Sequence, residues 1–473
     1  MLRRARAGSS REPSASAVAP GSTSPSNRVR SVVGRAARPV RPTGPLRVLF
    51  VVPDLTFGGA ERHVLTLMPR LDPARFIPSL VCIGGEGEMF HYLPGTGIEA
   101  TVLHRRKREM LGALRDLVRL MRRQRPDIVV TRAFNAEALG RLAGVLARVP
   151  RLTVWVHNCG DLAPRGALRR ISDTLLRPVT AAVYGVAHGQ LSYLTEELGH
   201  RPEVVRIVHN GTDLTEAPTP PTRAQLRARA AELGLDPEAP IVGISAGLRP
   251  EKDHATLLRA MRRVVDELPD TQLLVLGDGP LEAELRALTT HLGLADHVVF
   301  AGGRHDVERL LPVLTVFALS SFTVEAFPMA LLEAMAARLP AVCTDVGGIA
   351  EMITEGETGH IVPARDPAAL AHGLLSVLGD RDHAAMMGRA ARARVAREFT
   401  LERSVAEAQR VLEETAGRAN QGGQARGRAA PAADRAGGAW VGVAGSPLPG
   451  PKHDLAVGGA RPTAGGGHGE GAQ

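Results

Sequence analysis

The sequence predicts an α/β fold with two parallel sheets, and two observations support this. Short apolar runs alternate with helix-like stretches through the middle of the chain, as in consecutive strand–helix–strand units. The alternation occurs twice, over residues 45–208 and over residues 209–398, and a chain of 473 residues is long enough for two hydrophobic cores. We therefore expect two Rossmann-like domains that face each other, with a ligand cleft at the carboxyl ends of their strands.

The first half begins with a strand-like run, LRVLFVV (46–52), which is followed by Gly58, Gly59 and an expected helix. Glycines there let the backbone approach a ligand at a helix N-terminus, although a simple turn also uses them. The further strand candidates of this half are FIPSLVCI, ATVL, DIVVT, RLTVWV and AAVYGVA. The first half therefore reads as a parallel sheet, and HNGTDL (209–214) closes it.

The second half repeats the pattern and ends in one more helix. Its strand-and-turn candidates are PIVGISAGL, TQLLVLGDGP, HVVFAGG, LLPVLTVFALSS and PAVCTDVGG. One helix is expected to begin with Pro328 in its first turn, where a proline loses no hydrogen bond, and the last helix covers residues 399–416. Residues 1–44 and 417–473 are rich in Gly, Ala, Pro or Arg without periodicity, so we expect both tails to be disordered.

The composition narrows the range of partners. The formal net charge is +9, but only three of the 58 basic residues are lysines, and this skew gives any single arginine little weight. With 3% aromatic residues and no nucleic-acid-binding motif, we expect no nucleic-acid partner. Cys82, Cys159 and Cys343 form no C-x-x-C pair, so we expect reduced thiols, no metal site and a cytoplasmic protein. No apolar run is long enough to predict a membrane-spanning helix.

The stretch EAFPMALLE places Glu325 and Glu333 on either side of seven uncharged residues. Glu325 precedes the expected helix and Glu333 lies beyond its first turn, while the N–H groups of residues 327–330 form a partly positive anion site. This arrangement suits a sugar diphosphate whose hydroxyls donate to the two carboxylates. The alternative is that Glu325 only complements the helix dipole and Glu333 faces water.

The surrounding residues resemble a known family. SSFTVEAFPMALLEAMAARLPAVCTDVGGIAEMITEGETGHIVP is similar to the signature of the retaining glycosyltransferases of family 4, which have the GT-B fold. FGGAERHVL, HNGTDL, SAGLRPEKDHATLLRA and LLVLGDGPLEAELRALTTHLGL resemble further family segments in the family's order. The resemblance covers roughly residues 46–415. It implies sugar transfer from a nucleotide-sugar to a hydroxyl acceptor, and a last helix that crosses back to the first domain.

The resemblance also implies roles for single residues. The catalytic candidates are His157 near the donor sugar and the acceptor, Lys252 on the diphosphate and Glu325 on the sugar hydroxyls. The donor-binding candidates, of which the last contacts the ribose, are Gly58, Gly59, Arg249, Lys252, Gly277, Asp278, Glu325, Ala326, Phe327, Pro328, Met329 and Glu333. Lys252 and backbone amides then replace a metal ion, so no metal and no cofactor is expected. Asp278 as a turn cap and Glu351 as a helix cap remain alternatives.

Two positions depart from the family pattern. Gly247 stands where the family usually has an arginine, five residues before the lysine, and Arg249 is the nearby substitute. His188 follows Ala187 where many relatives have a serine, which makes His188 a candidate acceptor contact. Gly247 keeps a non-enzymatic alternative open, namely a degenerate GT-B protein that binds a partner or a glycan without turnover. An epimerase or a phosphorylase on the same fold is the other alternative.

Residues 104–126 are dense in arginine and place Leu111, Leu114, Val118 and Met121 at three- and four-residue steps. Such spacing predicts an amphipathic helix with a basic face, which suits an anionic membrane surface or, alternatively, plain solvent. With the family resemblance, this implies a UDP- or GDP-sugar donor and a glycan or lipid-linked acceptor in cell-envelope polysaccharide or glycolipid synthesis. The protein would then lie in the cytoplasm or at the inner face of the membrane.

Overall fold

The computed structural model describes residues 39–40, 43–56, 58–106, 108–161, 166–214 and 221–417. The two tails that the sequence predicts to be disordered lie outside the described residues, apart from a few residues at their inner ends. The described residues belong to one compact unit, Met1–Ala419. No helix among them has the length and apolar content needed to cross a bilayer.

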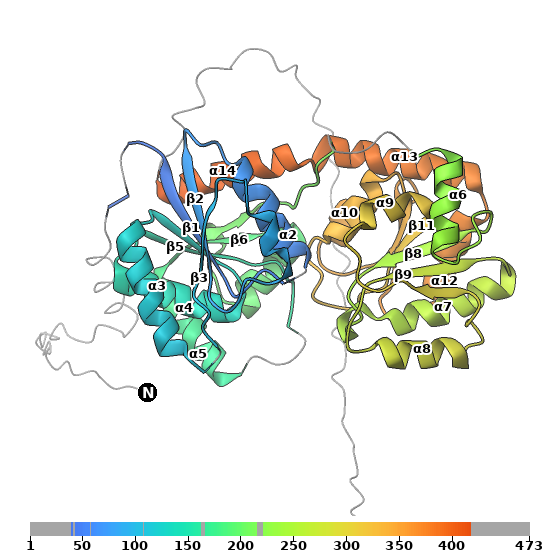
Figure 1. Ribbon diagram of the computed structural model, residues 1–473, viewed down its shortest axis with the longest axis horizontal. Coiled ribbons are helices and arrows are strands. Elements are labelled where there is room, and N and C mark those ends of the chain that lie inside the picture. The colour runs from blue at the N-terminus through green and yellow to red at the C-terminus, as the bar shows by residue number, and fades with distance from the viewer. Residues whose placement is uncertain are drawn as a thin grey trace, which may run out of the picture. The chain divides into compact units, whose positions relative to one another are not determined.

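The described residues form two sheets whose paired strands are all parallel (Figure 1). The first has the order β3-β2-β1-β4-β5-β6-β7, with β1 (Leu46–Val52), β2 (Phe76–Cys82), β3 (Glu99–Val102), β4 (Ile128–Thr131), β5 (Arg151–Trp155), β6 (Thr180–Gly185) and β7 (Val205–Ile207). The second has the order β10-β9-β8-β11-β12-β13, with β8 (Ile241–Ser245), β9 (Gln272–Leu276), β10 (Val298–Phe300), β11 (Val316–Leu319), β12 (Ala341–Thr344) and β13 (Gly359–Val362). The two parallel sheets confirm the predicted fold class.

The strand order reverses direction between β1 and β4 in the first sheet and between β8 and β11 in the second. In doubly wound folds this reversal is the topological switch point, where loops leaving two adjacent strands separate and open a crevice. The loops after these four strands are therefore the expected place for ligand binding.

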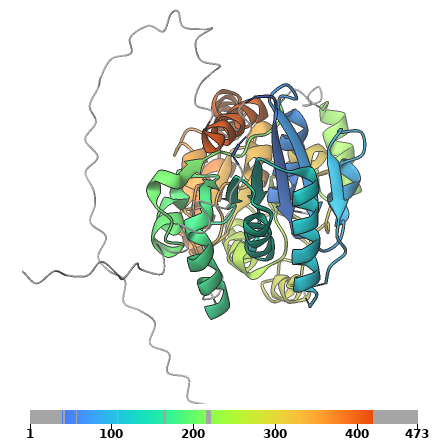
Figure 2. The same ribbon diagram turned by 90° about the vertical axis from the view of Figure 1, so that its left-hand side faces the viewer.

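Helices cover both sides of the first sheet (Figure 2). In β1, Leu46, Val48 and Phe50 belong to one hydrophobic cluster, while Leu49 and Val51 belong to another, because successive strand residues point to opposite faces. The helices that complete these clusters are α2 (Gly59–Leu67) and α14 (Leu401–Ala416) on one face and α3 (Met110–Gln124) and α4 (Phe134–Ala147) on the other; α5 (Ala167–Leu176) contacts α4.

The second sheet is covered in the same way. Its helices are α6 (Arg223–Glu232), α7 (His254–Glu267), α8 (Glu282–His291), α9 (Val307–Leu310), α10 (Met329–Ala336), α11 (Ile349–Met352), α12 (Pro367–Leu378) and α13 (Arg381–Glu398). Several begin at an aspartate whose carboxylate accepts backbone N–H bonds of the first turn, namely Asp253, Asp366 and Asp380. These caps explain where α7, α12 and α13 begin.

The last helix, α14, returns to the first sheet, as the family resemblance implies (Figure 1). The side-chain oxygen of Gln409 accepts the backbone N–H of Asp72 at 2.8 Å. Arg75 donates to both carboxylate oxygens of Glu413, at 2.9 and 2.6 Å. The preceding helix α13 packs instead against α10 of the second half. The chain therefore crosses between the halves twice, once before β8 and once before α14.

Two local expectations differ from the structure, and a third is refined by it. In the strand-and-turn unit that begins at Leu310, Leu311–Val313 forms a 3₁₀ turn with a proline near its start, and the strand β11 begins at Val316. Pro328 is the residue before α10 rather than a member of its first turn, with ψ at 123°. Leu111, expected on the apolar stripe of α3, is 84% exposed because α3 packs through Ala113 and the residues one and two turns later.

Candidate functional site

Lys252 and Glu325 meet at the switch point of the second sheet. Lys252 ends a short 3₁₀ helix after β8, and Glu325 lies in the loop after β11. The Lys252 ammonium nitrogen forms an ion pair with Oε1 of Glu325, and the Ser321 hydroxyl donates to the same oxygen at 2.9 Å. The side chains are 24% and 10% exposed. The structure thus brings together two of the predicted catalytic residues in a largely buried, ion-paired state.

The backbone between Glu325 and α10 is fixed at two carbonyl groups. The Ala326 carbonyl accepts the N–H of Gly348 at 2.8 Å, and the Phe327 carbonyl accepts the Asn210 amide at 2.7 Å. At Gly347, φ is +60°, and a Cβ there would lie 1.7 Å from the Glu325 carbonyl oxygen, so only glycine fits. The two glycines after β12 therefore let the chain press against the loop that carries Glu325.

The glycine loop of the first half reaches the same place. Gly59 begins α2, and a Cβ on Gly59 would lie 3.4 Å from Cβ of Met329, the first residue of α10. The N-termini of α2 and α10 therefore lie against each other. Two helix N-termini at one spot present partly positive N–H groups, which is the chemistry that binds a diphosphate. Gly58, Gly59 and Met329, predicted from different halves, are brought together.

Glu333 lies on α10 and is held by an arginine that the sequence reading missed. Nη1 of Arg62, on α2, is 3.1 Å from Oε1 of Glu333, and Arg62 also pairs with Glu308. Burial raises the pKa of Glu333 to about 7, although the nearby guanidinium opposes the rise. Arg62 belongs to the FGGAERHVL segment, but an arginine-rich composition gave it no weight.

His157 follows β5 in a layer of rings. Its ring stacks on Trp155 at 5.7 Å between centroids and meets His63 of α2 edge-on at 5.9 Å. Within the described residues, no ring nitrogen of His157 or His63 has a hydrogen-bond partner. Burial, with the Arg132 guanidinium nearby, lowers the pKa of His63 to about 3 and that of His157 well below its usual range. His157 is therefore a neutral imidazole at neutral pH.

The turn after β9 packs against the segment around Gly247. Gly277 and Gly279 have φ of +146° and +156°, and a Cβ on Gly277 would lie 2.1 Å from the Ala246 carbonyl oxygen. The Asp278 carbonyl accepts the N–H of Leu248 at 2.7 Å. The role that the structure shows for this turn is thus to support the loop after β8, which carries Lys252.

Gly247, by contrast, has free space beside it. A Cβ there would meet no atom closer than 3.6 Å, and one of the two nearest atoms is Nε of Arg249. The exposed side chain of Arg249 thus runs past the position that an arginine at residue 247 would occupy.

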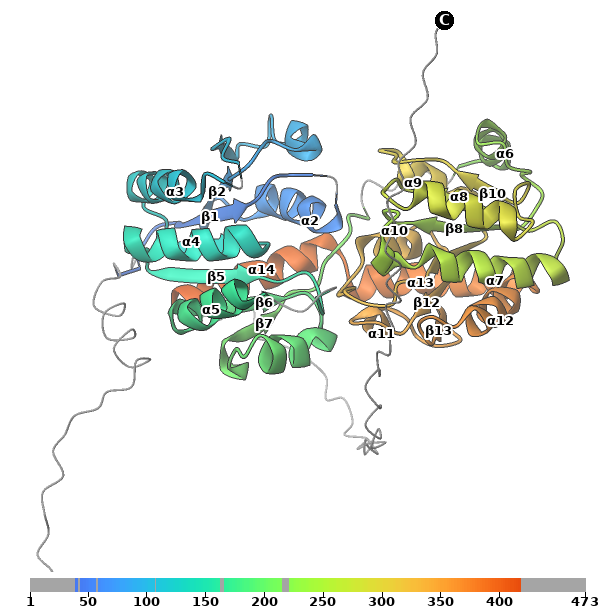
Figure 3. The same ribbon diagram turned by 90° about the horizontal axis from the view of Figure 1, so that it is seen from below.

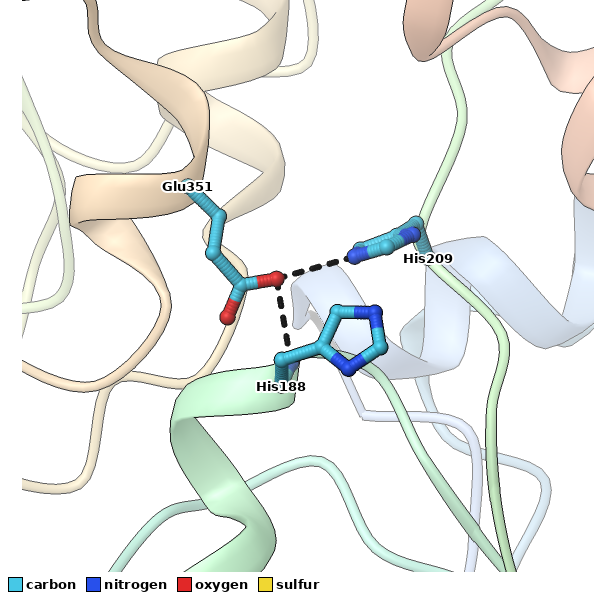
Figure 4. Close-up of side chains that lie close together, drawn as sticks. All are labelled: His188, His209 and Glu351. Carbon is cyan, nitrogen blue, oxygen red and sulfur yellow. Dashed lines mark hydrogen bonds and ion pairs between the residues drawn. The ribbon is translucent and has the colours of Figure 1, made fainter. Parts of the chain in front are cut away.

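His188 lies near the glycines after β12, because a Cβ on its neighbour Gly189 would lie 2.2 Å from the Gly347 carbonyl oxygen. It begins the 3₁₀ helix η4 (His188–Gln190) of the first half and lies beside His209 and Glu351 (Figure 4). The Glu351 carboxylate accepts the backbone N–H groups of His188 and Gly189, at 3.0 and 2.6 Å. Glu351 thus caps η4 across the two halves rather than its own helix α11.

Comparisons with known proteins agree with this architecture. The family model described as "Glycosyl transferases group 1" matches residues 227–394, and the model "Glycosyltransferase Family 4" matches residues 57–216. The chain resembles the structure of Anabaena Alr3699/HepE in complex with UDP-glucose, with a TM-score of 0.70 and 21% identity, over 78% of this chain and all of that one. At that identity the structural likeness supports the fold alone.

Two curated relatives add sequence similarity. The chain is 32% identical to a GDP-mannose-dependent alpha-(1-6)-phosphatidylinositol monomannoside mannosyltransferase of Mycolicibacterium smegmatis, over 55% of this chain and 70% of the relative. It is 24% identical to the UDP-Gal:alpha-D-GlcNAc-diphosphoundecaprenol alpha-1,3-galactosyltransferase of Escherichia coli, over 57% of this chain and 70% of that protein. With the switch-point pair, the paired helix N-termini and both family models, the chain belongs to glycosyltransferase family 4 and has the GT-B fold.

Proposed function

We propose that this protein transfers a sugar from a UDP- or GDP-sugar to a hydroxyl acceptor with retention of the anomeric configuration, and without a metal ion. The observation that carries the proposal is the Lys252–Glu325 ion pair beside the N-termini of α2 and α10. The pair places a cation that can bind phosphate and a carboxylate that can accept sugar hydroxyls at one switch point. Ligands bind at such points in doubly wound folds.

The ion pair is the resting state of the donor site. When a donor binds, its diphosphate offers Lys252 a more highly charged partner than one carboxylate, so the ammonium turns to the phosphate oxygens. Glu325 stays in place because the Ser321 hydroxyl still donates to it, and its freed oxygen accepts a sugar hydroxyl. Lys252 and the helix N-termini then stabilise the charge that develops on the departing nucleoside diphosphate.

Glu333 is the proposed ribose contact. Its carboxylate points at the junction of α10 and α2, where Arg62 holds it. A carboxylate accepts two hydroxyl hydrogen bonds, as the vicinal hydroxyls of a ribose require. Arg62 orients that carboxylate and offsets its charge near the diphosphate.

His157 is proposed to position the acceptor. Because burial keeps its imidazole neutral, one ring nitrogen can accept and the other can donate a hydrogen bond to a bound acceptor. A neutral ring beside the reacting sugar can orient the attacking hydroxyl without adding positive charge next to an oxocarbenium-like centre. In a same-face reaction the proton of that hydroxyl passes to the leaving phosphate, so His157 need not take it.

Arg249 is proposed to replace the cation that Gly247 lacks. Its side chain runs past the empty space at residue 247 and is exposed, so it is free to turn to the second phosphate. This substitution favours an active enzyme over the degenerate alternative, because the donor site then keeps two cations, Lys252 and Arg249.

For the acceptor we propose a lipid-linked glycan at an anionic membrane surface. Six large apolar side chains are exposed on α3, α4 and α5, which follow one another along one side of the first sheet (Figure 3): Met110, Leu111, Leu142, Leu146, Ile171 and Leu175. Exposed arginines such as Arg115 and Arg119 share α3 with them. Apolar side chains among arginines match the interface of an anionic bilayer. The names of both relatives include lipid acceptors, phosphatidylinositol monomannoside and diphosphoundecaprenol.

The experiment incubates the full-length protein with UDP- and GDP-sugars and an extract of lipid-linked acceptors in EDTA, and follows nucleoside diphosphate release by chromatography. We expect release from one donor, product with the anomeric configuration of the donor by NMR, and no release by Lys252→Ala. Release that stops in EDTA and returns with a metal ion would overturn metal independence. Free epimerised sugar without acceptor would indicate the epimerase, and donor binding without any release would indicate the degenerate protein.

A further inference from the structure

Two histidines and a glutamate from three separate segments come together (Figure 4). His188 begins η4 after β6, His209 lies in the connection between the two sheets, and Glu351 lies on α11 of the second half. Each offers one ligand atom, and these atoms all lie within 4.8 Å of one another. Among the residues that the structure describes, this is the group whose spacing suits a metal ion.

The distances are close to those that a tetrahedral ion needs. Zinc–nitrogen and zinc–oxygen bonds of about 2.0–2.2 Å place neighbouring tetrahedral ligands about 3.3 Å apart. Nε2 of His209 and Oε2 of Glu351 are already 3.0 Å apart. The ring of His188 has its centroid 5.5 Å from that of His209, and its side chain is exposed, so a side-chain rotation brings it into range.

The surroundings hold the ligands as the outer shell of a metal site does. Both carboxylate oxygens of Glu351 accept backbone N–H bonds, from His188 and Gly189, which fixes the plane of the carboxylate. The His209 ring packs against both Phe327 and Phe399, with centroids 5.0 and 5.9 Å away. Three of the four acceptor positions of the carboxylate are used, one of them by the His209 bond that an ion would replace.

We propose that His188, His209 and Glu351 form a binding site for one divalent ion of the zinc type, with water as the fourth ligand. Two imidazoles and a carboxylate favour Zn²⁺ or Co²⁺ over Mg²⁺ and Ca²⁺, which take oxygen ligands. An ion bound here replaces the hydrogen bond between Nε2 of His209 and Oε2 of Glu351.

Such an ion ties the two halves of the chain together. It joins η4 of the first half to α11 of the second through His209, whose ring contacts Phe327 in the donor loop. If the proposed transferase opens and closes between turnovers, the ion slows opening and inhibits it. That consequence rests on the proposed function, whereas binding of the ion does not.

The experiment titrates the full-length, EDTA-stripped protein with Zn²⁺ by calorimetry and with Co²⁺ by visible absorption, and records the melting temperature with and without Zn²⁺. We expect one tight site per chain and a melting temperature that rises with Zn²⁺. His209→Ala and Glu351→Gln should each weaken that site by about 100-fold or more, since even outer-shell changes cost up to that much. The His209 ring contacts Phe327 of the donor loop, so the readout for both variants is Zn²⁺ binding by calorimetry and not transferase activity.

His360→Ala is the matched control, because His360 also pairs with a glutamate, Glu355, at 2.7 Å in the second half. It should bind Zn²⁺ as the unchanged protein does. Equal affinity in His209→Ala would show that the ion binds elsewhere, for example at histidines outside the described residues, and would overturn the proposal. So would the lack of any tight site in the unchanged protein. Circular dichroism and the metal-free melting temperature show whether each variant is folded.

Discussion

At the scale of single residues, the buried carboxylate of Glu333 is the group with the most distinctive electrostatics. Its pKa is raised to about 7 by burial, above the usual value of 4.5, while Arg62 at 3.1 Å only partly compensates. The folded state therefore favours the protonated form. A pKa that rises on folding makes the protein most stable below the unfolded pKa and less stable as pH rises to the folded pKa.

We predict that Glu333→Gln removes a pH dependence of stability. Between about pH 4.5 and 7 the unchanged protein should lose about 3 kcal/mol of unfolding free energy, which is the size of that pKa shift. The amide variant has no proton to lose, so it should be the more stable protein at pH 8 and gain nothing at pH 4.5. Urea unfolding at both pH values measures this. Parallel stability curves for the two proteins would show that Glu333 titrates normally.

The sequence predicts a residue of the candidate site only where that residue belongs to a recognisable motif. Lys252 and Glu325 were identified from the sequence, but their ion pair was not, because the two lie 73 residues apart and meet only through the β8–β11 pairing. Arg62 and His209 were missed. One is an arginine in an arginine-rich chain, and the other takes its meaning from Glu351, which is far away in sequence.

At the scale of elements, the loop after β8 carries the main departure from the family pattern. A Cβ on Gly247 would lie no closer than 3.6 Å to any other atom, and the exposed side chain of Arg249 passes close to it. The loop therefore has room for the missing arginine without a shift of the backbone.

We predict that Gly247→Arg strengthens donor binding by about tenfold or more, the effect of one added charge-assisted hydrogen bond to phosphate. Gly247→Ala is the control and should change little, because its Cβ makes only ordinary contacts. Calorimetric titration with UDP and GDP measures both. A Gly247→Arg protein that binds no better would mean that Arg249 already supplies the whole effect, and Arg249→Ala should then weaken binding as strongly.

The sequence predicts the strands that stand out as apolar runs, including the short edge strands β3 and β10, but it misses two other short edge strands. β1 was predicted with the bounds that the structure has. β7, with three residues, and β13, with four, lie at sheet edges, where too few residues reveal a period. The sequence predicts a strand and a turn in the segment of β11 but not where the strand begins, because the short helix and the proline turn before it are also apolar.

At the scale of the whole molecule, the exposed apolar side chains on α3, α4 and α5 suggest how the enzyme meets its acceptor. We predict that the double variant Leu111→Ser/Ile171→Ser weakens binding to phosphatidylglycerol-containing vesicles by about tenfold, since each large apolar side chain contributes up to about 1.5–3 kcal/mol when buried. Sedimentation with vesicles measures it. Met386→Ser, at a similarly exposed methionine of α13, should bind normally. If Met386→Ser weakened vesicle binding as much as the double variant does, binding would not depend on the exposed apolar side chains of α3, α4 and α5.

We propose that the Lys252–Glu325 pair opens to receive the donor, with the cation on the diphosphate and the carboxylate on the sugar. Calorimetric titration of the full-length protein with a nucleoside diphosphate and with its nucleotide-sugar tests it most directly. Lys252→Ala should weaken the binding of both ligands by about 10- to 100-fold. Glu325→Gln frees the Lys252 ammonium, so the nucleoside diphosphate should bind more tightly. The sugar of the nucleotide-sugar should then add less to the affinity than it does in the unchanged protein. If Glu325→Gln changed both ligands equally, or Lys252→Ala changed neither, the pair would not be the donor site.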